Sequence, residues 1–321
     1  MCIDRSRILL WTVDRGLWTF FNLVVVKKQK PHALPVYNIE SFRTGSKSLF
    51  FDIKLLEQHV RQFEVTHHPH RHDFYLVLFV TQGGGVHTMD FVDYAVKPYS
   101  AFFLTPGQVH AWRFTADAKG YVIFFTAAFY RLFQRTRQLS DFPFFHSITS
   151  PGCLYLDPQG EDLFTPMLEE MARESLQSEA GRDEILHNYL DIFLLRLARY
   201  YRREETEQVS PTLTLQVQKL ESYIEAHFRT LKQPRDYANL MNVTPKHLND
   251  ICKRGLNKTI SELIQERLLL EIKRLLTYSD ATIKELAVTL GFQDKSYLMR
   301  FFKKHTGLTL DQFREHQNQA L

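Results

Sequence analysis

The chain has 321 residues, of which 44% are hydrophobic and 24% are charged. These proportions describe a soluble globular protein of two or three domains and exclude a disordered or fibrous chain. The formal net charge of +4 is unevenly spread, because residues 211–321 carry 17 Lys and Arg against 12 Asp and Glu. A basic excess confined to the C-terminal third is typical of a domain that meets a polyanion.

The N-terminal segment, residues 1–35, is a poorly specified extension. Its apolar run LWTFFNLVVV (17–26) is too short to span a bilayer, and no small-residue cleavage site follows it. Cys2, Cys153 and Cys252 are far apart and odd in number, which suits a reducing cytoplasm and no disulfide framework. We therefore expect a cytoplasmic protein that has no membrane partner.

Residues 36–157 have the texture of short strands. Apolar β-formers such as FYLVLFV (74–80) and AFFLTPG (101–107) alternate with turn signals, among them the three glycines 83–85. This spacing predicts an all-β sandwich or barrel.

Residues 158–201 read as a helical hairpin, with helices predicted over 161–178 and 183–201 on either side of Gly181. In the second helix, apolar residues that include Ile185 and Ile192 recur at helical spacing. This stripe must bury against the barrel, against a second copy of the chain, or both, so we expect a homodimer. A polar, charged linker follows at 202–212.

Residues 213–321 read as helical throughout, with clear start signals. Thr244 precedes a proline, and TISE (259–262) and TIKE (282–285) match the capping box, in which Thr and Glu satisfy each other's free backbone N–H groups.

This C-terminal region contains an internal duplication. DYANLMNVTPKHLNDICKR (236–254) aligns with ELAVTLGFQDKSYLMRFFKK (285–304) at an offset of 49, and of 50 after one extra residue. Each copy reads as a short helix with a central Ala, a turn at Asn242 or Gly291, and a second capped helix, which predicts a helix-turn-helix. One copy alone would not be distinguished from a generic helical hairpin. The intervening helix of about 30 Å would hold the two second helices near one turn of B-DNA, roughly 34 Å, apart.

The stretch IKELAVTLGFQDKSYLMRFFKKHTGLTLDQFR (283–314) resembles the signature of the AraC/XylS family of transcription regulators, and the resemblance extends over 213–316. Leu310 departs from the family pattern, which usually has proline there. The sequence TLDQ (309–312) still offers a capping box, so we expect the last helix to form.

The resemblance implies that the second helix of each unit reads DNA. In the second unit we expect an outward face made by Lys295, Ser296, Met299, Arg300, Lys303 and Lys304. Arg300 would contact guanine or a phosphate, and Lys303 and Lys304 would contact phosphates. In the first unit, Lys246 and Asn249 would read bases while Lys253 and Arg254 bind phosphates. Asp250 occupies the position of Arg300 and would repel phosphate, and the plainer alternative is that some of these charges only keep a helix face soluble.

The stretches HHPHRHDFYLVLFVTQGGGVHTMDF (67–91) and LTPGQVHAW (104–112) resemble the cupin-like sensor domain that many members of this family carry. The resemblance implies a small barrel that binds an effector, and the expected contacts are His70, His72, Tyr75, His110 and Trp112.

Three interpretations are open for this segment. A small polar effector, of which a sugar is one candidate, would use the histidines for hydrogen bonds and an aromatic face for packing. His70, His72 and His110 also match a metal-binding cupin, but Leu76 and Val77 stand where a carboxylate ligand is expected. The third alternative is a polar strand edge with a few core histidines. We therefore expect no metal and no cofactor.

Taken together, the sequence predicts a multidomain regulator: an N-terminal cupin-like β-barrel with a helical hairpin, then an all-α domain with two helix-turn-helix units at 213–321. The expected partners are double-stranded DNA, a small-molecule effector, a second copy of the chain and RNA polymerase. No phosphate loop or nucleophile motif points to an enzyme. The alternatives are a metal-dependent cupin enzyme fused to a nucleic-acid-binding domain, and an RNA or architectural DNA binder without sequence preference.

Overall fold

A computed structural model describes residues 34–42, 48, 50–63, 68–134, 136–145, 152–157, 159–204 and 210–320. All of them lie in one compact unit that spans residues 32–321. The expected N-terminal extension falls outside the described residues except for Leu34 and Pro35. Within the described part of the chain, no helix is long and apolar enough to cross a membrane.

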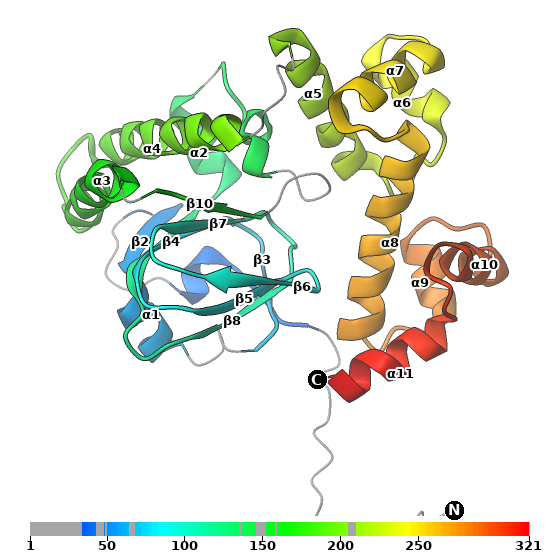
Figure 1. The fold of residues 1–321 in the computed structure, drawn as a ribbon, viewed down its shortest axis with the longest axis horizontal. Helices are drawn as coiled ribbons and strands as arrows, with labels where there is room; N and C mark the ends of the chain where they lie inside the picture. The colour runs from blue at the N-terminus through cyan, green and yellow to red at the C-terminus, as the bar shows by residue number, and fades with distance from the viewer. Residues whose placement is uncertain are drawn as a thin grey trace, which may run out of the picture. The chain divides into compact units, whose positions relative to one another are not determined.

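The apolar runs of the N-terminal half form two main antiparallel sheets (Figure 1). The five-stranded sheet has the order β10-β7-β4-β9-β2 and contains Cys153–Tyr155, Ser100–Leu104, Tyr75–Gln82, Lys119–Phe125 and Phe51–Leu55. The three-stranded sheet has the order β6-β5-β8 and contains Val92–Val96, Gly85–Met89 and His110–Phe114. A short parallel pair, β1 (Val36–Tyr37) and β3 (Arg71–His72), lies beside them, and His70 bridges to His110. In the described residues the ladders form separate sheets, so the predicted barrel is open and sandwich-like.

Side-chain alternation along β4 explains why its sequence is apolar at nearly every position. Successive strand residues point to opposite faces. Leu76 and Leu78 enter the core between the two sheets, whereas Val77 and Phe79 enter a second core against the helices. Because both faces of this strand are covered, both sets must be apolar.

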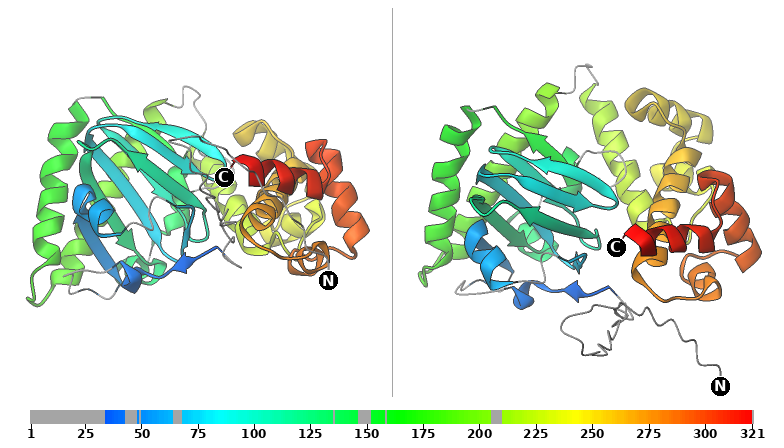
Figure 2. Two further views of the ribbon diagram at one scale, coloured as in Figure 1. Left: turned by 90° about the horizontal axis from the view of Figure 1, so that it is seen from below. Right: turned by 60° about the horizontal axis from the view of Figure 1, so that its bottom comes forward.

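The helices that cover the outer face of the five-stranded sheet are α2 (Ala127–Phe133), α3 (Gln159–Ser175) and α4 (Arg182–Glu204) (Figures 1 and 2). Helix α1 (Leu56–Gln62) lies on the other side of this sheet, where its Leu56 joins the core between the sheets. Short 3-10 turns occur at Ile39–Ser41, Leu139–Asp141 and Pro143–Phe145. The predicted hairpin is therefore present, with Gly181 at a positive φ of 85° between its two helices.

The buried stripe of α4 contains Phe193 and Leu197, as expected, but not Ile185 and Ile192. Its fully buried residues are Leu186, Leu190, Phe193, Leu194 and Leu197. Ile185 and Ile192 lie on the opposite side and are 42% and 44% exposed. The sequence did not distinguish these positions because the apolar stripe of this helix is wide.

The C-terminal region is helical as predicted. Its helices are α5 (Pro211–His227), α6 (Pro234–Met241), α7 (Pro245–Leu256), α8 (Ile260–Tyr278), α9 (Ile283–Thr289), α10 (Lys295–Thr306) and α11 (Leu310–Ala320). Because α4 extends to Glu204 and α5 begins at Pro211, the expected linker is helical at both ends, and residues 205–209 lie outside the described part.

The predicted caps are confirmed. Thr259 and Thr282 form capping boxes with Glu262 and Glu285, and Thr244 caps α7 ahead of its proline. Thr309 exchanges hydrogen bonds of 2.9 and 3.2 Å with Gln312, so the leucine at position 310 does not prevent α11 from forming.

Candidate nucleic-acid interface and effector site

Each helix-turn-helix unit turns at a residue in the left-handed conformation. Asn242 has φ 55° after α6, and Gly291 has φ 64° after α9. A Cβ at position 291 would lie 2.1 Å from the carbonyl oxygen of Arg229, so only glycine fits there.

The inner faces of the two units pack alike. Ala238 and Ala287 are buried in the middle of the first helices, where a small residue lets the second helix cross closely. Leu248 and Leu298 are fully buried at matching positions of α7 and α10. The two units share one hydrophobic core, to which α8 contributes Leu263, Leu268 and Ile272 among others.

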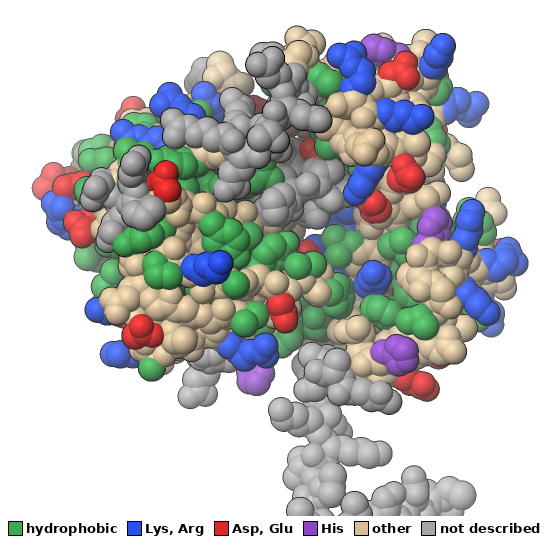
Figure 3. Space-filling model, viewed as in Figure 1, with side chains coloured by type: hydrophobic (Ala, Val, Ile, Leu, Met, Phe, Trp, Pro, Cys, Tyr) green, Lys and Arg blue, Asp and Glu red, His purple; other side chains and the backbone are tan. Residues whose placement is uncertain are grey.

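The outer faces carry the residues that the sequence assigns to DNA. The exposed ones are Lys246, Lys253, Arg254, Lys295, Ser296, Met299, Arg300, Lys303 and Lys304, and Asn249 is half-buried. Lys and Arg side chains gather over α6, α7 and α10 on the face shown in Figure 3. None of these side chains contributes to the core, so the outward face predicted from helical spacing is present.

Arg300 and Lys304 border a groove of about 290 Å³ that also involves Lys232 and Gln233 at the start of α6. Its described lining contains no Asp or Glu. The groove brings cations of the second unit next to the first unit.

Two outward residues escaped the sequence reasoning. His247 lines a groove beside the turn of the first unit, and Tyr297 is 46% exposed on α10. The duplication pairs these two positions at the same offset of 50, so the alignment of the copies contained the signal. Both side chains are exposed, on the second helices of their units.

A buried ionic ladder runs along α8. The carboxylate of Glu271 accepts from Arg267 at 3.0 Å and from Arg274 at 3.3 Å, and Arg229 lies 3.0 Å away. Arg267 also binds Glu225 with two bonds of 2.6 and 2.8 Å. Burial raises the pKa of Glu271, but the arginine charges outweigh it and lower the pKa to about 2.

The ladder reaches the sensor domain through Arg274. Its guanidinium donates to both carboxylate oxygens of Asp90, at 2.7 and 2.6 Å. Asp90 follows β5, and its neighbour Phe91 stacks on Tyr278 at the end of α8. Helix α8, which joins the two helix-turn-helix units, is therefore in direct contact with the turn that follows β5.

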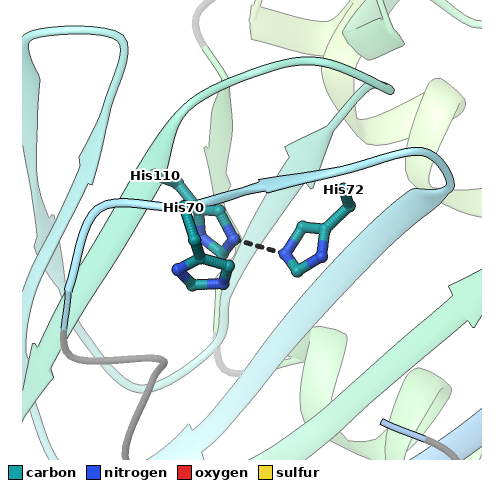
Figure 4. A group of neighbouring side chains, drawn as sticks. All are labelled: His70, His72 and His110. Carbon is teal, nitrogen blue, oxygen red and sulfur yellow. Dashed lines mark hydrogen bonds between the residues drawn. The ribbon is translucent and has the colours of Figure 1, made fainter. Parts of the chain in front are cut away.

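The effector candidates meet in the core between the two sheets. His70, His72 and His110 are each at most 3% exposed, and their ligand nitrogens all lie within 4.8 Å of one another (Figure 4). The Nε2 atoms of His72 and His110 are 2.6 Å apart. Trp112 is buried beside them, with its ring centroid 5.1 Å from that of His110.

Tyr75 does not join this cluster. It stacks on Phe125 and meets Phe145 edge to face, in the second core against the helices. Because β4 residues alternate between faces, position 75 points away from the side that Leu76 shares with the histidines. This assignment is corrected by the structure.

His87 joins the cluster although the sequence reasoning passed over it. It is fully buried on β5, and its Nε2 lies 3.0 Å from Nδ1 of His110. Burial lowers the pKa of His70 to about 4 and that of His87 to about 3, and it holds the pKa values of His72 and His110 well below 6.5. The four imidazoles are therefore neutral at neutral pH, which is the form that accepts hydrogen bonds and binds metals.

Two sequence models of known domains match separate parts of the chain. Residues 50–190 match the sequence model of the AraC-like ligand-binding domain, and residues 237–316 match that of a helix-turn-helix domain. A ligand-binding domain joined to a DNA-binding domain defines a ligand-responsive transcription regulator. The chain belongs to the AraC family of such regulators.

Curated relatives extend over most of the chain. The HTH-type transcriptional activator RhaR of Cronobacter sakazakii is 21% identical over 243 residues, which cover 75% of this chain and 84% of the relative. RhaR of Yersinia pestis is 21% identical over 249 residues, with coverages of 77% and 84%.

Two solved structures are similar to most or part of this chain. ToxT of Vibrio cholerae with bound unsaturated fatty acid covers 85% of this chain and 96% of its own, at 11% identity and a TM-score of 0.38. The C-terminal domain of AraT, a response regulator from Geobacillus stearothermophilus, covers 34% and 88%, at 26% identity and a TM-score of 0.31. The family assignment rests on the two sequence matches.

Proposed function

We propose that this regulator places α7 and α10 in successive major grooves of a bipartite operator, with α8 setting their separation. The observation that carries the proposal is the pair of matched units with shared inner packing and cation-bearing outer faces. The 19 residues of α8 span about 28 Å, which is close to the pitch of B-DNA. A regulator of this kind acts in the cytoplasm, next to RNA polymerase at the promoter, and its relatives named as activators favour activation.

The outward residues divide into two roles. Ser296 and Met299 lie on the part of α10 that points away from the core and would contact base edges. Lys303 and Lys304 would bind phosphates, and Arg300, which lines the groove between the units, would clamp the DNA backbone there. In the first unit Lys246 and Asn249 would read bases, whereas Lys253 and Arg254 would bind phosphates.

The effector would bind at the histidine cluster. His70, His72, His110 and Trp112 converge there, and ring nitrogens of His70, His72, His87 and Trp112 lack hydrogen-bond partners among the described residues. Buried polar atoms of this kind call for a ligand with polar groups of its own. A small polar molecule meets that need, and a sugar is the first class to test.

Ligand binding would reach the DNA through Asp90. β5 carries His87 into the cluster and ends one residue before Asp90, which binds Arg274 on α8. A ligand that shifts β5 would therefore change the stability of this ion pair and bias the placement of α8, which is a coupling between two sites. Asp90→Asn should change the effector dependence of DNA binding, and unchanged dependence would contradict this route.

The exposed face of α4 is the proposed dimer contact. Ile185 and Ile192 are seven residues apart on one side of the helix, the spacing of a helix–helix seam. Ile192→Lys should lower the measured molecular mass in sedimentation, while Leu190 and its buried neighbours keep the fold intact.

Selection of duplexes from a random pool tests the DNA assignment. We expect a site with two submotifs about one helical turn apart, with Asn249→Ala relaxing one submotif and Ser296→Ala the other. Arg300→Ala should weaken binding to all sequences alike if it clamps a phosphate. Absence of enrichment, both without ligand and with candidate sugars, would contradict a sequence-specific reader.

A further inference from the structure

The histidine cluster has a donor arrangement that hydrogen bonding alone does not satisfy. Nδ1 of His70 lies 2.8 Å from the backbone oxygen of His68. Because a carbonyl oxygen only accepts, this nitrogen carries the proton and donates it. The other nitrogen of His70, Nε2, therefore has a free lone pair, and it has no partner among the described residues.

The other three imidazoles form a chain from His72 through His110 to His87. One neutral imidazole has one N–H and one lone pair. If His110 donates to His72, then His72 keeps an unpartnered N–H and His87 an unpartnered lone pair. If the chain runs in the opposite direction, the two ends exchange roles. In both cases a buried donor and a buried acceptor lack partners, at Nδ1 of His72 and Nδ1 of His87.

We propose that His70, His72 and His110 bind one divalent transition-metal ion, of the class of Zn²⁺, through their Nε2 atoms. An ion accepts the lone pair of His70 and those of the other two Nε2 atoms. Zn–N bonds of about 2.0–2.1 Å require the Nε2 atoms to lie about 3.3 Å apart in a tetrahedral site. The 2.6 Å contact between His72 and His110 must therefore open by under 1 Å, and the longest separation, which is at most 4.8 Å, must close by up to about 1.5 Å. The fourth position remains for an oxygen ligand.

Outer contacts already orient two of the three ligands. Metal-bound histidines donate their second ring N–H to a neighbouring acceptor, which fixes the ring and the tautomer. His70 does so to the backbone of His68. With its Nε2 on the ion, His110 carries its proton on Nδ1 and donates it to His87, so the ion also fixes the direction of the chain. His87 is thus a positioning residue. The sequence-based expectation of no metal took account neither of His87 nor of the backbone oxygen of His68.

The proposed metal site uses the same cluster as the proposed effector site. The test of the metal site is independent of the effector proposal, because metal binding is measured without effector or DNA. The full-length chain is stripped with a chelator and titrated with Co²⁺, whose tetrahedral complexes absorb visible light. Zn²⁺ uptake is counted by elemental analysis. We expect one equivalent per chain, and an X-ray absorption spectrum of the zinc-loaded protein with imidazole nitrogens and no sulfur in the first shell.

Variants locate the ion. His72→Gln should abolish the equivalent, and His87→Gln should keep it but weaken affinity on the order of 10–100-fold. The matched control is His59→Gln, because His59 is equally buried in the same core and also has an unpartnered ring nitrogen, but lies outside the group of three. Far-UV circular dichroism confirms that each variant is folded.

Either of two results would overturn the proposal. The first is a folded wild-type chain that takes up no metal. The second is a His72→Gln variant that binds metal as the wild type does, which would place the ion elsewhere. If the His72 variant does not fold, the X-ray absorption spectrum decides on the wild type alone, since a shell without imidazole contradicts the site.

Discussion

Glu271 provides the sharpest test of how the DNA-binding domain is held together. Its carboxylate is 4% exposed and lies within 3.3 Å of three arginines. Glu271→Gln keeps the size of the side chain but removes the charge, leaving Arg267 and Arg274 buried next to a neutral amide. Breaking a buried ion pair in this way costs about 3–5 kcal/mol.

The pKa of Glu271 gives an independent magnitude. In the folded state it is about 2, against 4.5 for the free side chain. Since each pKa unit corresponds to about 1.4 kcal/mol, the ionised carboxylate contributes on the order of 3 kcal/mol at neutral pH. The folded pKa is the lower one, so the unfolded chain takes up the proton first. This contribution is present above pH 5 and is lost as the pH falls from about 5 to 2.

The assay is urea unfolding of the full chain followed by far-UV circular dichroism, at pH 7 and at a series of lower pH values. Glu266→Gln is the matched control, because Glu266 lies on the same helix in a pair with Lys258 whose side chains are 42% and 38% exposed. We expect the control to lose less than about 1 kcal/mol of unfolding free energy. The stabilising role of the ladder would be refuted if the two variants lost the same free energy of unfolding. It would also be refuted if the stability of Glu271→Gln and of the wild type fell equally as the pH is lowered.

Three further predictions concern the helix-turn-helix units. Leu298→Ala should lower the free energy of unfolding by about 2–5 kcal/mol, whereas Met299→Ala, on the exposed face, should change it by under about 0.5 kcal/mol; equal effects in urea unfolding would mean that the faces are wrongly assigned. Gly291→Ala should lower the free energy of unfolding more than Gly307→Ala, because a Cβ at 291 meets a backbone oxygen and one at 307 meets nothing within 4 Å. Gly307→Ala carries only the penalty for the left-handed conformation, about 1–2 kcal/mol. A reversed order of melting temperatures would contradict this. Lys303→Ala should lower the slope of log affinity against log salt by about 1 for every duplex sequence, and a sequence-dependent loss would make Lys303 a base reader.

The C-terminal fold could be predicted from sequence because its signals are local. Capping boxes at Thr259 and Thr282 and left-handed turns at Asn242 and Gly291 depend on residues a few positions apart. The duplication then assigned inner and outer faces to α7 and α10 without tertiary information. In the ladder at Glu271, Arg267 and Arg274 are also local, four and three residues away on α8. The contacts that complete the ladder, with Arg229, Glu225 and Asp90, join distant parts of the chain and lay beyond such reasoning.

The sensor was harder to predict because its contacts are non-local. Tyr75 lies three residues from His72, but strand alternation sends it to another core. His87 could have been found from the same alternation in GVHTM, which places it on the inward face with Met89. Closure of the barrel could not be judged, because it depends on pairing between strands that are distant in the chain.

The spacing of the operator tests the central claim most directly. If α8 holds α7 and α10 as a rigid pair, the distance between their two submotifs is fixed. Affinity of the full chain is measured by fluorescence anisotropy for the selected duplex, and for duplexes with 5 or 10 base pairs inserted between the submotifs. We predict that both insertions reduce the affinity to that of a single submotif, since a strut of about 28 Å cannot span a second turn. Full affinity after either insertion would contradict a two-unit reader set by α8.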